Sequence, residues 1–163
     1  MPFAEGIHGA LRSPPMKILL FGLGSPGSRR PLERALARLG HETVAENDVD
    51  VAFVRLEAGE LRVVIADGRL PKFDWIDLCR HLRENPPTAG VHFILVESPN
   101  EDSSHEAWAT EAGVDGFLYR PGDERELRGL LLLASRRLGA AAGRGQHPLT
   151  MPPAGEFGPT SLD

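Results

Sequence analysis

Three glycines with a strict spacing follow the first apolar run of the chain and could bind the phosphates of a nucleotide. Gly22, Gly24 and Gly27 form the pattern G-x-G-x-x-G between a predicted strand and a predicted helix. Glu46 lies about 20 residues further on, where a carboxylate would accept a hydrogen bond from a ribose hydroxyl. Pro26, however, removes one backbone donor from the helix N-terminus where a pyrophosphate would bind. A small Rossmann-like nucleotide-binding module is therefore kept as an alternative, because small residues also permit a tight turn without any ligand.

A second group of reactive side chains stands at the ends of three predicted strands. Asp67, Glu97 and Arg120 each end a short apolar run, and Ser98 directly follows Glu97. In an open parallel sheet the carboxyl ends of the strands meet at one edge, where ligands bind. Because an arginine fork matches carboxylates bidentately, we expect Arg120 to pair with Asp67, with Glu97 or with both. The alternatives are that Glu97 serves as a substitute metal ligand, or that Arg120 and Glu97 face solvent.

Short apolar runs that alternate with amphipathic stretches would place these residues at one edge of a sheet. Runs that are apolar throughout are typical of parallel strands buried on both faces. Alternation of strands with helices implies right-handed crossovers and helices on both faces of the sheet. The predicted strands cover 17–22, 41–46, 61–67, 91–98 and 115–120, and the predicted helices cover 26–39, 49–58, 73–83, 101–112 and 123–138.

The order of these pieces resembles the receiver domain of bacterial two-component response regulators over residues 17–138. Asp67 and Pro71 match the family's phospho-acceptor aspartate and the D-x-x-x-P loop after it, and Arg120 and Pro121 stand where the family has Lys-Pro. The resemblance implies a flavodoxin-like α/β fold, a doubly wound five-stranded parallel sheet of order 2-1-3-4-5. Further matches are Pro26, Arg29, Leu32, Leu36 and Gly40 in the first helix and the segment 112–117 before the fifth strand.

The departures from that family lie in its phosphorylation pocket. Leu23 and Gly24 stand where the family has two adjacent acids that hold Mg²⁺, and Glu97 (or Ser98, if the alignment shifts by one) replaces its Thr or Ser. Asp67 is the unchanged position. Because Mg²⁺ requires several oxygen ligands, we expect its binding to be weak or absent, and we predict no other cofactor. The resemblance thus implies a stand-alone signalling module that is independent of phosphorylation, with conventional phosphorylation at Asp67 as the alternative.

Aromatic and leucine side chains indicate where a partner would bind. Phe117 takes the position of the family's aromatic switch residue, Trp108 falls on the fourth predicted helix, and Trp75 stands where receivers usually have a small glycine. The last helix carries more leucines, Leu131 among them, than one buried stripe needs. The resemblance implies a dimer face on the fourth and fifth helices and the fifth strand. We predict a homodimer or a docked signalling protein there; partial burial of the tryptophans is the alternative.

Composition excludes several classes of protein. The chain has 41% hydrophobic and 25% charged residues and a net charge of −5, which argues against nonspecific binding of nucleic acid or anionic membranes. No apolar stretch reaches the roughly 20 residues that span a bilayer. The single cysteine, Cys79, fits a reducing compartment and is predicted to face the core, and the six histidines lack metal-ligand spacing. We therefore predict a cytoplasmic protein that is not an enzyme and binds no metal.

The two ends of the chain differ from its middle. Met16 stands directly before the first strand, so either Met16 is the natural start or residues 1–15 form a flexible arm. The stretch 140–163 is rich in Gly, Pro, Ala and Ser and is predicted to be disordered. Residues 16–139 are thus predicted to form the receiver-like domain.

Overall fold

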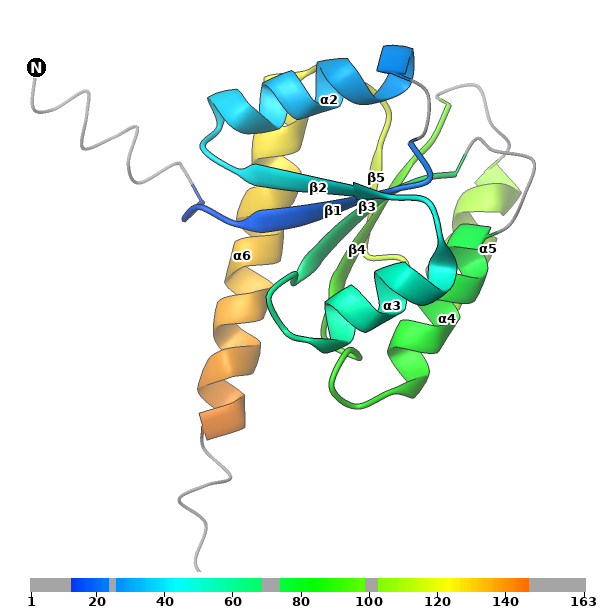
Figure 1. Cartoon of the computed structure of the whole chain (residues 1–163), viewed down its shortest axis with the longest axis vertical. Helices are drawn as coiled ribbons and strands as arrows, with labels where there is room; N and C mark the ends of the chain where they lie inside the picture. Colours follow the sequence, from blue (N-terminus) through cyan, green and yellow to red (C-terminus); the bar gives the residue numbers. More distant parts are fainter. Residues whose placement is uncertain (1–12, 24–25, 69–73, 99–102, 147–163) are drawn as a thin grey trace, which may run out of the picture.

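Five parallel strands form one sheet of order β2-β1-β3-β4-β5, with helices on both faces (Figure 1). This confirms the predicted flavodoxin-like architecture. The computed structural model describes residues 13–23, 26–68, 74–98 and 103–146. The elements are β1 (Lys17–Phe21), α2 (Pro26–Arg38), β2 (Glu42–Glu46), α3 (Val49–Glu57), β3 (Val63–Asp67), α4 (Asp74–Glu84), β4 (His92–Val96), α5 (Ser103–Ala112), β5 (Gly116–Leu118) and α6 (Glu124–Gln146).

The core lies in two layers, one on each face of the sheet. All five residues of β3 and all five of β4 are buried, which is why these runs are apolar without alternation. Their side chains point alternately to the two faces: Val64 packs with α3, α4 and α5, while Ile65 packs with α2 and α6. Cys79 is buried, as predicted, in the layer that contains α3, α4 and α5, and burial raises the pKa of its thiol to about 11.

The ends of the domain differ from the prediction in two places. The last helix continues to Gln146, beyond its predicted end at Leu138, because the alanines that follow Gly139 favour helix over disorder. Within the predicted N-terminal arm, Ser13 is not free: its hydroxyl lies 3.2 Å from Nε2 of His41. The Met16 amide also donates to Nδ1 of His41 at 3.0 Å. None of the helices in the described ranges is long and apolar enough to span a bilayer.

Polar contacts join α4, β4 and β5 at the amino end of the sheet. Arg83 donates to the carbonyls of Gly113 and Val91, and its guanidinium lies 2.7 Å from a carboxylate oxygen of Asp115. Gly113 has a φ of +110°, and a Cβ on it would lie 2.9 Å from the Arg83 side chain. Glycine at this position therefore both ends α5 and makes room for Arg83.

His92 lies in the same cluster and makes stability depend on pH. Its ring is buried, with Nδ1 3.9 Å from Asp115. Burial lowers the pKa of His92 from its ordinary value of 6.5; Asp115 opposes this effect, whereas Arg137 and Arg83 add to it. The unfolded chain therefore takes up a proton at a higher pH than the folded chain does. The stability that depends on neutral His92 is present above pH 6.5 and is lost as the pH falls below it.

We expect the substitution His92→Gln to reduce the pH dependence of the free energy of unfolding. Urea denaturation at about pH 7.5 and about pH 5.5 measures this dependence, and the difference should shrink in the variant because one titrating group is removed. It should not vanish, because burial also lowers the pKa of His41. A difference equal to that of the wild type would contradict the assignment to His92.

Candidate functional site

The carboxyl edge of the sheet brings Asp67 and Glu97 onto neighbouring strand ends. Asp67 is the register partner of Val96, and the amide of Gly68 donates to the Val96 carbonyl at 2.9 Å. The Glu97 amide in turn donates to the Leu118 carbonyl at 2.9 Å. Asp67 and Glu97 are 6% and 2% exposed, so both carboxylates are buried groups. The predicted convergence of these two residues at one edge is confirmed.

An apolar side chain follows β1 at the same edge. Phe21 pairs with Ala66, so the residues that come after β1 adjoin the end of β3 and Asp67. Leu23 is 1% exposed and packs in the layer formed by α2 and α6. It offers no side-chain oxygen beside Asp67. Gly24, the second position of the missing acidic pair, lies outside the described residues, as does Pro71.

Glu46 has a structural role that the sequence did not reveal. One oxygen of its carboxylate accepts from the amides of Asn47 and Asp48, at 3.1 and 3.2 Å, and the other lies 4.0 Å from Arg55. The carboxylate therefore supports the turn that leads into α3. Gly22 has a φ of +77° where the chain leaves β1, and its amide donates to the Glu46 carbonyl, which extends the pairing of β1 with β2. These contacts disfavour the nucleotide-binding alternative, in which Glu46 would face a ribose.

Glu97 contacts α5 rather than Arg120. Its Oε1 lies 3.0 Å from Nδ1 of His105, and the two side chains are 1% and 22% exposed. The His105 ring in turn lies against two indoles, with centroid distances of 6.2 Å to Trp75 and 5.8 Å to Trp108. The sequence did not single out His105 as a partner of Glu97, because no motif encodes a contact that depends on how α5 packs against β4. Glu97 is therefore not a solvent-facing residue.

Arg120 does not make the predicted bidentate pair. Its side chain is 80% exposed, and its guanidinium lies 3.9 Å from a carboxylate oxygen of Asp123. The prediction that Arg120 pairs with Asp67 or Glu97 is wrong, and the alternative in which it faces solvent holds for Arg120. The reason lies in the chain after β5, where the backbone amide of Arg120 donates to Glu126 at 2.8 Å and the side chain is directed outward.

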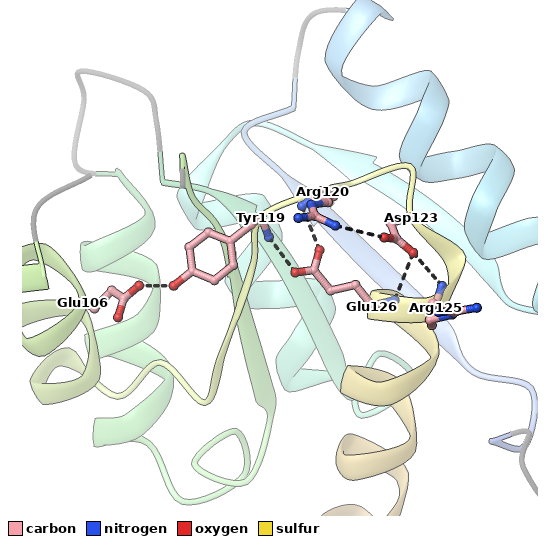
Figure 2. Close-up of a pocket in the computed structure, with 6 residues that line it drawn as sticks. All are labelled: Glu106, Tyr119, Arg120, Asp123, Arg125 and Glu126. Atoms are coloured by element: carbon pink, nitrogen blue, oxygen red, sulfur yellow. Dashed lines mark hydrogen bonds and ion pairs between the residues drawn. The ribbon is translucent and has the colours of Figure 1, made fainter. Parts of the chain in front are cut away.

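A surface pocket of about 600 Å³ lies where α5, β5 and α6 meet (Figure 2). The Tyr119 hydroxyl donates to the carboxylate of Glu106 on α5. Asp123 accepts from the amide of Glu126 at 3.3 Å and so caps the N-terminus of α6. Glu126 reaches back to the amides of Tyr119 and Arg120, so this acid fixes the end of β5. The lining residues are Glu106, Tyr119, Arg120, Asp123, Arg125 and Glu126.

The predicted interface residues divide into exposed and buried groups. Trp108 is 37% exposed, whereas Trp75 is 2% exposed and belongs to the core. Phe117 is half-buried and stacks on Tyr119 with ring centroids 6.5 Å apart. Leu131 is fully buried, so its prediction as an interface residue is wrong; Leu133, two positions on, is the exposed leucine at 42%. Ser98 and Pro121 are half-buried.

No three His, Cys, Asp or Glu side chains in the described part of the chain lie close enough together to hold a metal ion. The same question can be asked of the side chains at the carboxyl edge of the sheet. Among the described residues at that edge, Asp67 and Glu97 are buried acids on neighbouring strand ends, and the apolar Leu23 follows β1 beside them. Leu23 therefore contributes no oxygen to the octahedral shell that Mg²⁺ prefers.

Glycine at position 68 is required by the buried carboxylate beside it. A Cβ there would lie 2.5 Å from Oε1 of Glu97 and 2.7 Å from Cγ of Leu95. We expect Gly68→Ala to destabilise the fold by about 1–3 kcal/mol, because buried neighbours cannot move aside without strain. Gly90→Ala is the matched control, since nothing lies within 4 Å of its Cβ position. Urea denaturation compares the two, and equal stabilities would show that Glu97 does not pack on Gly68.

Comparison with known proteins agrees with this geometry. No family model matches the chain. The alkaline phosphatase synthesis transcriptional regulatory protein PhoP of Bacillus subtilis is 25% identical over 111 residues, which are 68% of this chain and 45% of that protein. The chemotaxis protein CheY1 of Helicobacter pylori is 28% identical over 108 residues, which are 65% of this chain and 86% of that protein. The chain thus spans less than half of the PhoP relative and most of the CheY relative.

A solved structure extends the likeness to three dimensions. The receiver domain of a sensor histidine kinase from Pseudomonas aeruginosa, described with a magnesium ion coordinated in its active-site cleft, superposes with a TM-score of 0.61 at 23% identity. The match covers 77% of this chain and 99% of that one. With strands in the order 2-1-3-4-5 and sequence relatives of two regulator types, the chain is homologous to the receiver domains of CheY-type and PhoP-type response regulators.

Proposed function

We propose that this chain is a receiver-type signalling module that acts through protein contacts and does not depend on phosphorylation of Asp67. The observation that carries the proposal is Leu23, an apolar residue buried beside the end of β3. In the receiver domains that the chain resembles, acids at this position hold Mg²⁺. We place the module in the cytoplasm, where the signalling proteins that it resembles would be its partners, and assign it no enzymatic activity.

Charge explains why the change at Leu23 matters. Transfer of a phosphoryl group to a carboxylate brings anionic oxygens toward an anion, so catalysis relies on neutralisation by a metal and a cation. Asp67 is one carboxylate beside an apolar wall, which is a poor ligand set for Mg²⁺. The cation is displaced as well, because the guanidinium of Arg120 is 80% exposed and lies near Asp123. Both sources of neutralisation are therefore weakened.

We expect no phosphorylation of the purified protein by acetyl phosphate and Mg²⁺. Intact-mass spectrometry would show an adduct of about 80 Da if Asp67 accepted a phosphoryl group. A receiver domain with both pocket acids, treated in parallel, checks the reagent, and Asp67→Asn checks the site. Stoichiometric labelling of the wild type that disappears in Asp67→Asn would overturn the proposal.

The surface formed by α5, β5 and α6 is the proposed contact face. Trp108 on α5 and Leu133 on α6 are large apolar side chains that are 37% and 42% exposed. Half-buried Phe117 and Tyr119 stack on each other at β5, between these two helices. Tryptophan and tyrosine are enriched among the residues that dominate binding energy. The face that the resemblance implies is thus built from exposed aromatic and aliphatic groups in this chain.

We expect the protein to self-associate through this face and Leu133→Glu to shift the equilibrium toward monomer. A charge introduced at an apolar interface loses its hydration when the interface forms. Light scattering over a range of concentrations measures the effect. Val54→Glu is the control, because Val54 is 64% exposed on α3, which follows β2 at the opposite edge of the sheet from β5. A wild type that remains monomeric at high concentration would remove the homodimer and leave docking of a different protein.

A further inference from the structure

Among the described side chains of α5, the buried ones are small, and the larger Trp108 is 37% exposed. These buried side chains are Ala109 and Ala112, which are 0% and 8% exposed. The neighbouring helix α4 buries five larger side chains, Trp75, Ile76, Leu78, Cys79 and Leu82. Alanine methyl groups remove much less apolar surface from water than these side chains do. The indole of Trp108, which lies 6.1 Å from that of Trp75, and the polar contacts of α5 therefore add to what the two alanines contribute.

Two consecutive residues of α5 make polar contacts with two different strand ends. His105 lies 3.0 Å from the carboxylate of Glu97, directly after β4. Glu106 accepts a hydrogen bond from the hydroxyl of Tyr119, directly after β5 (Figure 2). These contacts join the first half of α5 to the carboxyl edge of the sheet, where Asp67 also lies. Together they place the start of α5 against the ends of β4 and β5.

The contact with Glu97 is the more buried of the two. Its side chain is 1% exposed, and a carboxylate in such surroundings is costly unless charged or polar groups face it. Gly68 supplies the space that this carboxylate occupies, next to Asp67. The carboxyl group that directly follows β4 thus lies beside the acceptor position and contacts α5 through His105.

We propose that the contact between Glu97 and His105 is a latch that sets the position of α5 without a phosphoryl group. This inference rests on the proposed function, because a receiver that is not phosphorylated needs another means of fixing its contact face. The latch lies one residue from Glu106 and the Tyr119 hydrogen bond, so its opening would change the pocket at α5 and β5. The Glu97 side chain then fixes the position of α5 from within the chain, without the negative charge that a phosphoryl group on Asp67 would add.

Both tryptophans of the chain report on this contact. The chain contains two of them, and the centroids of Trp75 and Trp108 lie 6.2 and 5.8 Å from the His105 ring and 6.1 Å from each other. A movement of α5 would change the spacing of the three rings. Tryptophan fluorescence therefore detects opening of the latch in the unmodified protein.

The test is amide hydrogen exchange of the full chain in the absence of any phosphate donor. His105→Phe keeps an aromatic ring between the indoles and removes Nδ1, whereas Glu97→Gln keeps the shape of the side chain and removes its charge. We expect exchange within α5 to rise at least fivefold in each variant and exchange within α2 and α6 to stay unchanged, with a shift in tryptophan emission. The effects of the two substitutions should be less than additive in the double variant, because the contact between Glu97 and His105 is lost in all three proteins.

His81→Phe is the matched control, because the ring of His81 is exposed on α4 and contacts Phe53 at 4.4 Å rather than α5. Unchanged exchange of α5 in both variants would overturn the latch, and so would a rise shared equally by α2, α4 and α6, which would indicate general destabilisation. Additive effects in the double variant would overturn it too. None of these results depends on phosphorylation. Labelling of Asp67 by acetyl phosphate would contradict the proposed function, but it would not change the exchange rates of α5 that test the latch.

Discussion

The parallel pairing of β3 with β1 and β4 is the constraint on which the carboxyl edge of this molecule depends. All residues of β3 and β4 are buried, and their side chains fill cores on both faces of the sheet. A shift of register by one residue would exchange the two sets of side chains between cores of different shape, so the register is strongly specified. Asp67 ends the paired segment of β3, whereas Glu97 and Leu23 stand one and two residues beyond the paired segments of β4 and β1. Their neighbourhood is therefore set by apolar packing rather than by their own chemistry.

This constraint makes the identity of each edge residue decisive. A buried acid beside another buried acid requires groups that compensate the charge. In this chain the position next to Asp67 is apolar, because Leu23 belongs to the core between α2 and α6. The second acid, Glu97, comes from a different strand and contacts an imidazole from α5 at 3.0 Å. Both Leu23 and Glu97 are thus held at this edge by contacts with other groups of the protein.

The fold could be predicted from the sequence because its determinants are local and repeated. Uniformly apolar runs and glycines at helix ends, such as Gly40 with a φ of +91°, indicate the elements without knowledge of their packing. The presence of Asp67 and Glu97 at one edge followed from the same argument. The direction of Arg120 did not, because it depends on the hydrogen bonds of the turn after β5. The burial of Leu131 and exposure of Leu133 likewise depend on the rotation of α6 about its axis, which a run of leucines does not define.

The same distinction explains why His105 could not be found from the sequence. A helix that buries several large side chains shows its inner face as a periodic pattern, and α4 does so. A buried leucine contributes about 2 kcal/mol relative to an exposed one, whereas an alanine methyl contributes less than about 1 kcal/mol, so α5 shows only a faint pattern. Where apolar packing is weak, specific polar contacts decide how the helix lies, and single residues encode them. The element whose position is hardest to predict from the sequence is therefore also the one that a single contact can most readily control.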